Sequence, residues 1–149
     1  RFLMEVTQAV RAAIGDQVAL FVRISATDWV DEGWNLIDSI ELAAKLKAAG
    51  VDLIDVSSGG AVHNAPITPS PGFQVPFAAA IRKEAGIATA AVGLITEPDQ
   101  AQYIIETEEA DAVFLARAML RNPRWAMTAA EALGVKINWS LPLDRGRTI

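Results

Sequence analysis

The 149-residue sequence predicts an α/β fold in which helices cover a parallel sheet. Three observations indicate this class. Four apolar segments that are typical of strands alternate with segments of helical periodicity, and this order favours parallel pairing through helical crossovers. The strand segments are nearly continuous apolar runs, as expected for a sheet that is covered on both faces. The sequence is also 52% hydrophobic, which is enough to build a large core.

The first half of the chain predicts a helix, a strand, a second helix and a second strand. The first helix has an apolar stripe with a spacing of four residues and ends at Gly15. The residues of this stripe are Phe2, Val6, Val10 and Ile14. Because no capping residue precedes it, we expect the chain to be a fragment of something longer or one of two pieces; the alternative is a trimmed N-terminus. The segment 18–25 predicts a strand, 33–50 a helix, and 51–60 a strand that leads into a Ser/Gly turn.

The second half continues the alternation after a long proline-containing loop. In chain order we expect a helix, a strand, a helix, a strand and a last helix, at residues 73–84, 87–96, 97–110, 111–115 and 122–134. Pro98 and Pro123 stand where helices start, and Asn122 is the expected N-cap of the last helix. Residues 136–149 form a C-terminal tail. One helix followed by four strand–helix units fits either a doubly wound sheet or half of a (βα)8 barrel, and in both the site lies at the carboxyl ends of the strands.

Charge and composition exclude several classes of function. The formal net charge is −5 and the pI is about 4.8, whereas nucleic-acid and membrane-surface binding favour a basic face, so we expect neither partner. The sequence has no cysteine, no metal-ligand spacing, no signal peptide and no apolar run long enough for a membrane span. We therefore expect a soluble cytoplasmic protein without a metal site. Ser57 and Ser58 have no nearby base, which gives a serine hydrolase little support.

Two arginines stand at strand ends beside turns built from small residues. Arg23 lies near the end of the first strand, and Arg117 follows the fourth. Gly59, Gly60 and Gly93, in the turns after the second and third strands, let backbone N–H groups approach a ligand closely. Because arginine can donate two parallel hydrogen bonds to phosphate oxygens, this pattern predicts a phosphate site at that end of the sheet.

Other polar and aromatic residues have simpler interpretations. Instead of binding a ligand, either arginine could pair with an acidic neighbour such as Asp28 or Asp55. His63, the only histidine, stands in a loop without a carboxylate to orient it, and we interpret it as an ordinary loop residue. The acidic run at 106–111 is typical of a solvated helix end. Packing is the expected role of the tryptophans, which are Trp29, Trp34, Trp125 and Trp139.

Four segments in order resemble a known family. "LFVRISATDW", "VDLIDVSSGGAVH", "AAVGLIT" and "DAVFLARAMLRNPRWA" are similar to segments of the old yellow enzyme family, the FMN-dependent ene-reductases. The closest resemblance is to its short bacterial, thermophilic-type NADPH dehydrogenases. It runs through essentially the whole chain at matching spacing and covers only strands five to eight. The resemblance therefore implies the C-terminal half of a TIM (βα)8 barrel.

The resemblance implies a role for five residues at the strand ends. Arg23 would face the N1–C2 edge of the flavin, where a cation stabilises the reduced ring. Val92 and Gly93, together with Ala116 and Arg117, would hold the FMN phosphate through backbone N–H groups and the guanidinium. The family usually has glycine before this arginine, whereas here Ala116 stands there. Alanine keeps the N–H but disfavours a positive φ, so we expect an altered loop or a weaker affinity.

The resemblance also implies partners and a reaction. NADPH, or NADH, would reduce FMN, and the flavin N5 would then deliver hydride to an activated alkene such as an enone. The family's histidine pair and proton-donating tyrosine belong to the other half of the barrel, so we expect no catalytic residue here and an inactive chain on its own. Arg145 matches an arginine that reaches into a neighbouring subunit, which implies a homo-oligomer. Arg147 stands where the family often has an aromatic residue, and a disordered charged terminus is the alternative.

Two other functions stay open on the residues alone. The first is a different phosphate-binding barrel, such as a phosphosugar synthase or isomerase. The second is a non-catalytic half-barrel module with a vestigial phosphate site. Cofactor absorption would distinguish the first from a flavoprotein, and the presence of the other half of the barrel would decide the second.

Overall fold

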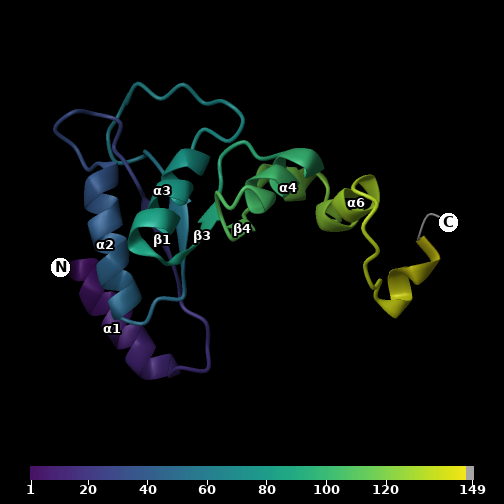
Figure 1. The fold of residues 1–149 in the computed structure, drawn as a ribbon, viewed down its shortest axis with the longest axis horizontal. Coiled ribbons are helices and arrows are strands. Elements are labelled where there is room, and N and C mark those ends of the chain that lie inside the picture. Colours follow the sequence, from purple (N-terminus) through teal and green to yellow (C-terminus); the bar gives the residue numbers. More distant parts are fainter. Residues whose placement is uncertain (147–149) are drawn as a thin grey trace.

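The computed structural model, which describes residues 1–146, contains a parallel sheet flanked by helices (Figure 1). The strands are β1 (Phe21–Ser25), β2 (Leu53–Ser57), β3 (Ala88–Ala91) and β4 (Ala112–Val113). The helices are α1 (Phe2–Ile14), α2 (Leu36–Ala48), α3 (Val75–Ala85), α4 (Pro98–Glu106), α5 (Arg117–Arg121) and α6 (Trp125–Ala132), with a final 3-10 helix at Leu141–Gly146. The predicted alternation of strands and helices is confirmed. Within residues 1–146, no helix combines the length and the apolar character that crossing a membrane requires.

The sheet has the strand order β1-β2-β3-β4, and every neighbouring pair is parallel. Each strand therefore lies beside the next one in the sequence. A doubly wound sheet reverses its strand order at a switch point, and no reversal occurs among the described strands. Of the two predicted architectures, the sequential order favours half of a barrel.

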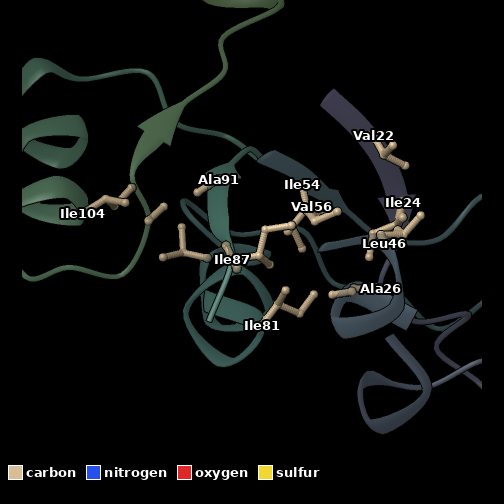
Figure 2. Packing of buried hydrophobic residues seen from close by; sticks show 14 of the residues in the cluster. Val22, Ile24, Ala26, Leu46, Ile54, Val56, Ile81, Ile87, Ala91 and Ile104 are labelled. Atoms are coloured by element: carbon tan, nitrogen blue, oxygen red, sulfur yellow. The ribbon is translucent and has the colours of Figure 1, made fainter. Parts of the chain in front are cut away.

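One face of the sheet packs against the helices. Val22, Ile54 and Thr89 share one register position, and Ile24, Val56 and Ala91 share another. These side chains are at most 9% exposed, and the apolar ones among them pack with Leu46 of α2 and Ile81 of α3 (Figure 2). The core thus lies between the sheet and one layer of helices.

The opposite face, which we call the inner face, carries polar and apolar side chains. Arg23, Asp55, Ala90 and Ala112 occupy one register position across all four strands. On the outermost strand, the inner-face residue Phe21 is 53% exposed. No helix of residues 1–146 covers this face in the way that α2 and α3 cover the other. In a closed barrel such a face is the interior.

Arg11 fastens α1 to the edge of the sheet. Its guanidinium donates to the carbonyl oxygens of Gly15 (2.7 Å) and Gly50 (Nε, 3.0 Å) and to Asp52 Oδ2 (2.7 Å). The same carboxylate oxygen accepts the backbone N–H of Leu20 at 2.7 Å, just before β1. The Leu20 N–H and the Arg11 guanidinium lower the pKa of Asp52. This cluster fixes the position at which β1 enters the sheet.

Several element boundaries differ from the prediction. The strands are shorter than the apolar runs, and β3 stops at Ala91 because the chain turns at Gly93, where φ is 113°. The last helix begins at Trp125 and not at Pro123. Asn122 Oδ1 accepts the N–H of Arg124 at 3.0 Å, so Asn122 closes a turn between two helices and is not the N-cap. A short helix was expected at the phosphate site, but the bounds of the five-residue α5 were not predicted, since it is too short to show a period.

Candidate functional site

A cavity of about 300 Å³ opens at the carboxyl ends of the strands. We call it the three-arginine cavity, because Arg23, Arg117 and Arg121 all line it. It contains every cofactor-binding residue that the sequence predicted: Arg23, Val92, Gly93, Ala116 and Arg117. These residues come from β1, from the loops after β3 and β4, and from the first position of α5. The prediction that they lie together is thus met, whereas their role toward a ligand stays a prediction.

The charged side chains that line this cavity are all positive. The chain has a formal net charge of −5, yet the residues that line the cavity include three arginines and no aspartate or glutamate. Within residues 1–146, neither Arg117 nor Arg121 takes part in an ion pair. Arginine side chains that line a cavity without an acidic lining residue form a site for an anion, and their planar fork matches a phosphate or carboxylate.

Arg23 differs from the other two arginines because it is paired. Its Nη1 lies 2.9 Å from Asp55 Oδ2 on the neighbouring strand, and its Nη2 donates to Ser57 Oγ at 3.0 Å. The alternative that an arginine pairs with Asp55 is therefore confirmed for Arg23. Asp28, the other candidate partner, instead accepts the N–H of Trp34 at 2.9 Å within its own loop. The side chain of Arg23 is still 56% exposed, so it can pair with Asp55 and line the cavity at the same time.

The loop after β3 requires glycine at position 93. Gly93 has a φ of 113°, which side chains disfavour, and a Cβ there would lie 2.7 Å from Gln74 Nε2 and 3.0 Å from Phe73 Cε1. The Gly93 carbonyl accepts the N–H of Gly72 at 2.9 Å. The loop therefore packs against the start of α3, and this contact sets one wall of the cavity.

The expected strain at Ala116 does not occur. Its φ is −96° and its ψ is −79°, so the residue avoids the left-handed region in which alanine would be penalised. The structure therefore shows no strain at Ala116, whereas an altered loop or a weaker affinity relative to the family stays a prediction. Ala116 is the residue before α5, and its carbonyl accepts the N–H of Leu120 at 3.0 Å. The short helix places Arg117 and Arg121 four residues apart, which is the spacing that brings two side chains to one helical face.

Among the cavity residues that were not predicted from the sequence, Arg121 and Gln74 contribute polar side chains that bear on the site. Arg121 stands four residues after Arg117, but the five-residue helix that makes the two side chains neighbours shows no period in the sequence. Gln74 had no local signal, since its neighbours in the cavity wall come from β2 and from the loop after β3.

Other predicted residues lie outside the cavity. His63 is exposed in the loop between β2 and α3 and does not line it, in agreement with its interpretation as a loop residue. Arg145 is exposed in the final 3-10 helix, away from the sheet (Figure 1), and Arg147 lies outside the described residues. Trp29 and Trp125 pack as predicted. Trp29 meets the ring of Phe77 edge-on at 5.4 Å, and Trp125 Nε1 donates to the Thr96 carbonyl at 2.8 Å.

Comparison with known proteins assigns the chain to a family. Residues 1–135 match the NADH:flavin oxidoreductase / NADH oxidase family. The chain belongs to this family. It is 53% identical over 146 residues to an NADPH dehydrogenase of Geobacillus sp. (strain WCH70) and 44% identical over 146 residues to that of Bacillus subtilis (strain 168). Each alignment covers 98% of this chain and 42% of the relative. The chain thus spans less than half the length of the curated relatives that it matches.

The fold of the chain also matches solved structures. A 2-naphthoyl-CoA reductase, solved in complex with 2-naphthoyl-CoA, superposes with a TM-score of 0.80 at 24% identity over 89% of this chain and 21% of that one. Together with the sequential parallel sheet, this match establishes the fold class as half of a TIM (βα)8 barrel. The resemblance to the old yellow enzyme family is confirmed by the family match.

Proposed function

We propose that this chain forms the C-terminal half of an FMN-dependent NADPH oxidoreductase and that its three-arginine cavity binds the FMN phosphate. The observation that carries the proposal is the convergence of Arg23, Arg117 and Arg121 on one cavity without an acidic lining residue. The family to which the chain belongs supports a flavin over a phosphosugar as the ligand. NADPH is the expected reductant because the relatives are NADPH dehydrogenases.

The chemistry of the residues fits a flavin mononucleotide. A phosphate dianion takes charge-assisted hydrogen bonds from guanidinium groups and N–H bonds from a loop that approaches closely. Arg117 and Arg121 supply the first, and the glycine loop at 92–93 supplies the second. The apolar side chains of Phe73 and Phe114 form other parts of the wall and suit the less polar parts of the ligand.

Each residue of the site has a distinct task in this proposal. Arg117 and Arg121 hold the phosphate and thereby fix the position of the whole cofactor. Arg23 presents a positive charge toward the ring, and Asp55 keeps the guanidinium in place through its 2.9 Å ion pair. A cation in that position favours the negative charge that accumulates on reduction. When bound, FMN supplies hydride transfer from its N5 atom.

The substrate and the remaining parts of the site belong to the complete barrel. We infer that the substrate is an activated alkene such as an enone, and that the proton donor comes from the N-terminal half. The outer edges of β1 and β4 carry no strand partner among residues 1–146, and unpaired edges of this kind need cover. The N-terminal half of the barrel is the proposed cover. Arg145 is proposed to reach a neighbouring subunit of a homo-oligomer, which agrees with its exposed position outside the cavity.

The visible absorption of the complete barrel protein tests the proposal. The purified protein should have the absorption bands of an oxidised flavin, and these bands should bleach on anaerobic addition of NADPH. Acid extraction should release FMN and not riboflavin. A colourless protein that takes up no FMN would contradict the proposal, and tight binding of a phosphosugar by that protein would favour the other barrel class.

A further inference from the structure

Gln74 joins three segments that surround the three-arginine cavity. It stands directly before α3 and is 4% exposed, although its amide is polar. The side-chain Oε1 accepts from Ser58 Oγ at 2.7 Å and from Ser57 Oγ at 3.4 Å, both at the end of β2. The side-chain Nε2 donates to the Val92 carbonyl at 3.2 Å, at the end of β3. A buried polar group with partners on two strands and a helix start fixes the distance between them.

These bonds continue to Arg23 and form one chain of donors and acceptors. The Arg23 Nη2 donates to Ser57 Oγ, and Ser57 Oγ donates in turn to Gln74 Oε1. The direction of each bond follows from chemistry. The Val92 carbonyl can only accept, so the Nε2 end of Gln74 must face it, and the Oε1 end is left for the serine hydroxyls. This series of hydrogen bonds thus runs from the ring side of the proposed site to its phosphate side.

The backbone of Gly93 packs closely against the side-chain amide of Gln74. A Cβ at position 93 would lie 2.7 Å from Gln74 Nε2, which leaves no room for a side chain between the loop and the amide. The position of the loop at 92–93 is therefore set by Gln74 both through a hydrogen bond and through direct contact. Packed interiors transmit such a contact because they contain few voids.

We propose that Gln74 is a positioning residue that holds the loop at 92–93 in the geometry needed to bind a phosphate. It acts through Ser57 and Gly93, and it gives the cavity its preference for the phosphorylated flavin over the dephosphorylated one. This inference rests on the proposed function, since it assigns a task to a residue of the same site. It predicts that replacement of Gln74 changes discrimination between FMN and riboflavin, and not merely stability.

The test measures the dissociation constants of FMN and riboflavin for the complete barrel protein after removal of its cofactor. Gln74→Met keeps the length and most of the volume of the side chain but removes all three hydrogen bonds. We expect FMN affinity to fall on the order of tenfold, with riboflavin affinity unchanged within about twofold. Gln102→Leu is the control, because it removes an amide on the exposed side of α4, outside the cavity.

A second variant covers the case in which Gln74→Met does not fold. Ser58→Ala removes only the 2.7 Å bond to Gln74 Oε1, and Ser58 does not line the cavity. Its expected loss of FMN affinity is about threefold, again without an equal loss for riboflavin. An unchanged ratio of the two dissociation constants, whether both affinities fall equally or neither falls, would overturn the inference. If the unmodified protein itself does not prefer FMN, the proposed function fails instead.

Discussion

Replacement of Arg117 by alanine is the most direct perturbation of the proposed phosphate site. In residues 1–146 Arg117 has no ion pair, and it is exposed, so its removal should leave the fold intact. A charge-assisted hydrogen bond contributes about 1.5–3 kcal/mol. Arg121 and Arg23 line the same cavity and remain, so we expect the lower part of this range. The predicted loss of FMN affinity is thus about tenfold to thirtyfold.

The assay titrates the cofactor-free complete barrel with FMN and with riboflavin, following the quenching of flavin fluorescence. Arg124→Ala is the matched control, since Arg124 is exposed on the same segment but does not line the cavity. Arg23→Ala should behave differently. It should lower the reduction potential of the bound flavin and slow reduction by NADPH more than it weakens binding. An equal loss of affinity for riboflavin and FMN in Arg117→Ala would refute the assignment of Arg117 to the phosphate.

Three further predictions concern the fold and the completeness of the barrel. Gly93→Ala should lower the free energy of unfolding by about 1–3 kcal/mol more than Gly60→Ala does. Both positions have a positive φ, but of the two only Gly93 has a neighbour within 4 Å of the added Cβ. Equal losses of stability in urea denaturation would contradict the contact with Gln74. The lowered pKa of Asp52 means that its stabilising contribution is present at neutral pH and is lost as the pH falls below about 4. Asp52→Asn should therefore reduce the free energy of unfolding at pH 7 and make it depend less on pH on the acid side. An unchanged dependence of stability on pH would count against the Arg11 cluster. The 149-residue chain alone should associate through its open strand edges, and a monodisperse monomer in sedimentation would disprove this. It should also not reduce enones with NADPH, and steady turnover would disprove that expectation.

The order of the elements and the gathering of the five predicted residues at one cavity could be predicted, because the first depends on local patterns and the second on parallel pairing. Apolar runs and helical stripes mark the elements, and parallel strands bring their carboxyl ends to one edge. The pairing of Arg23 with Asp55 and not with Asp28 could not be predicted, since it depends on the register between β1 and β2. The same holds for the φ of Ala116, which is set by the entry into α5. Gln74 was missed because its partners are 16 to 18 residues away in the chain.

The cavity is lined by residues from both edges of the sheet. Arg23 belongs to β1, at one edge of the sheet, and Arg117 follows β4, at the other edge, yet both line the same cavity. In a flat sheet three inter-strand spacings would separate these strands by about 14 Å. Curvature toward the inner face shortens this distance, and it is possible only where the inner side chains do not crowd one another. Ala90 and Ala112 stand at these inner positions of β3 and β4, in register with Arg23. We expect these small residues to leave room for such curvature, so that the curvature which closes a barrel also brings the two arginines to one anion site.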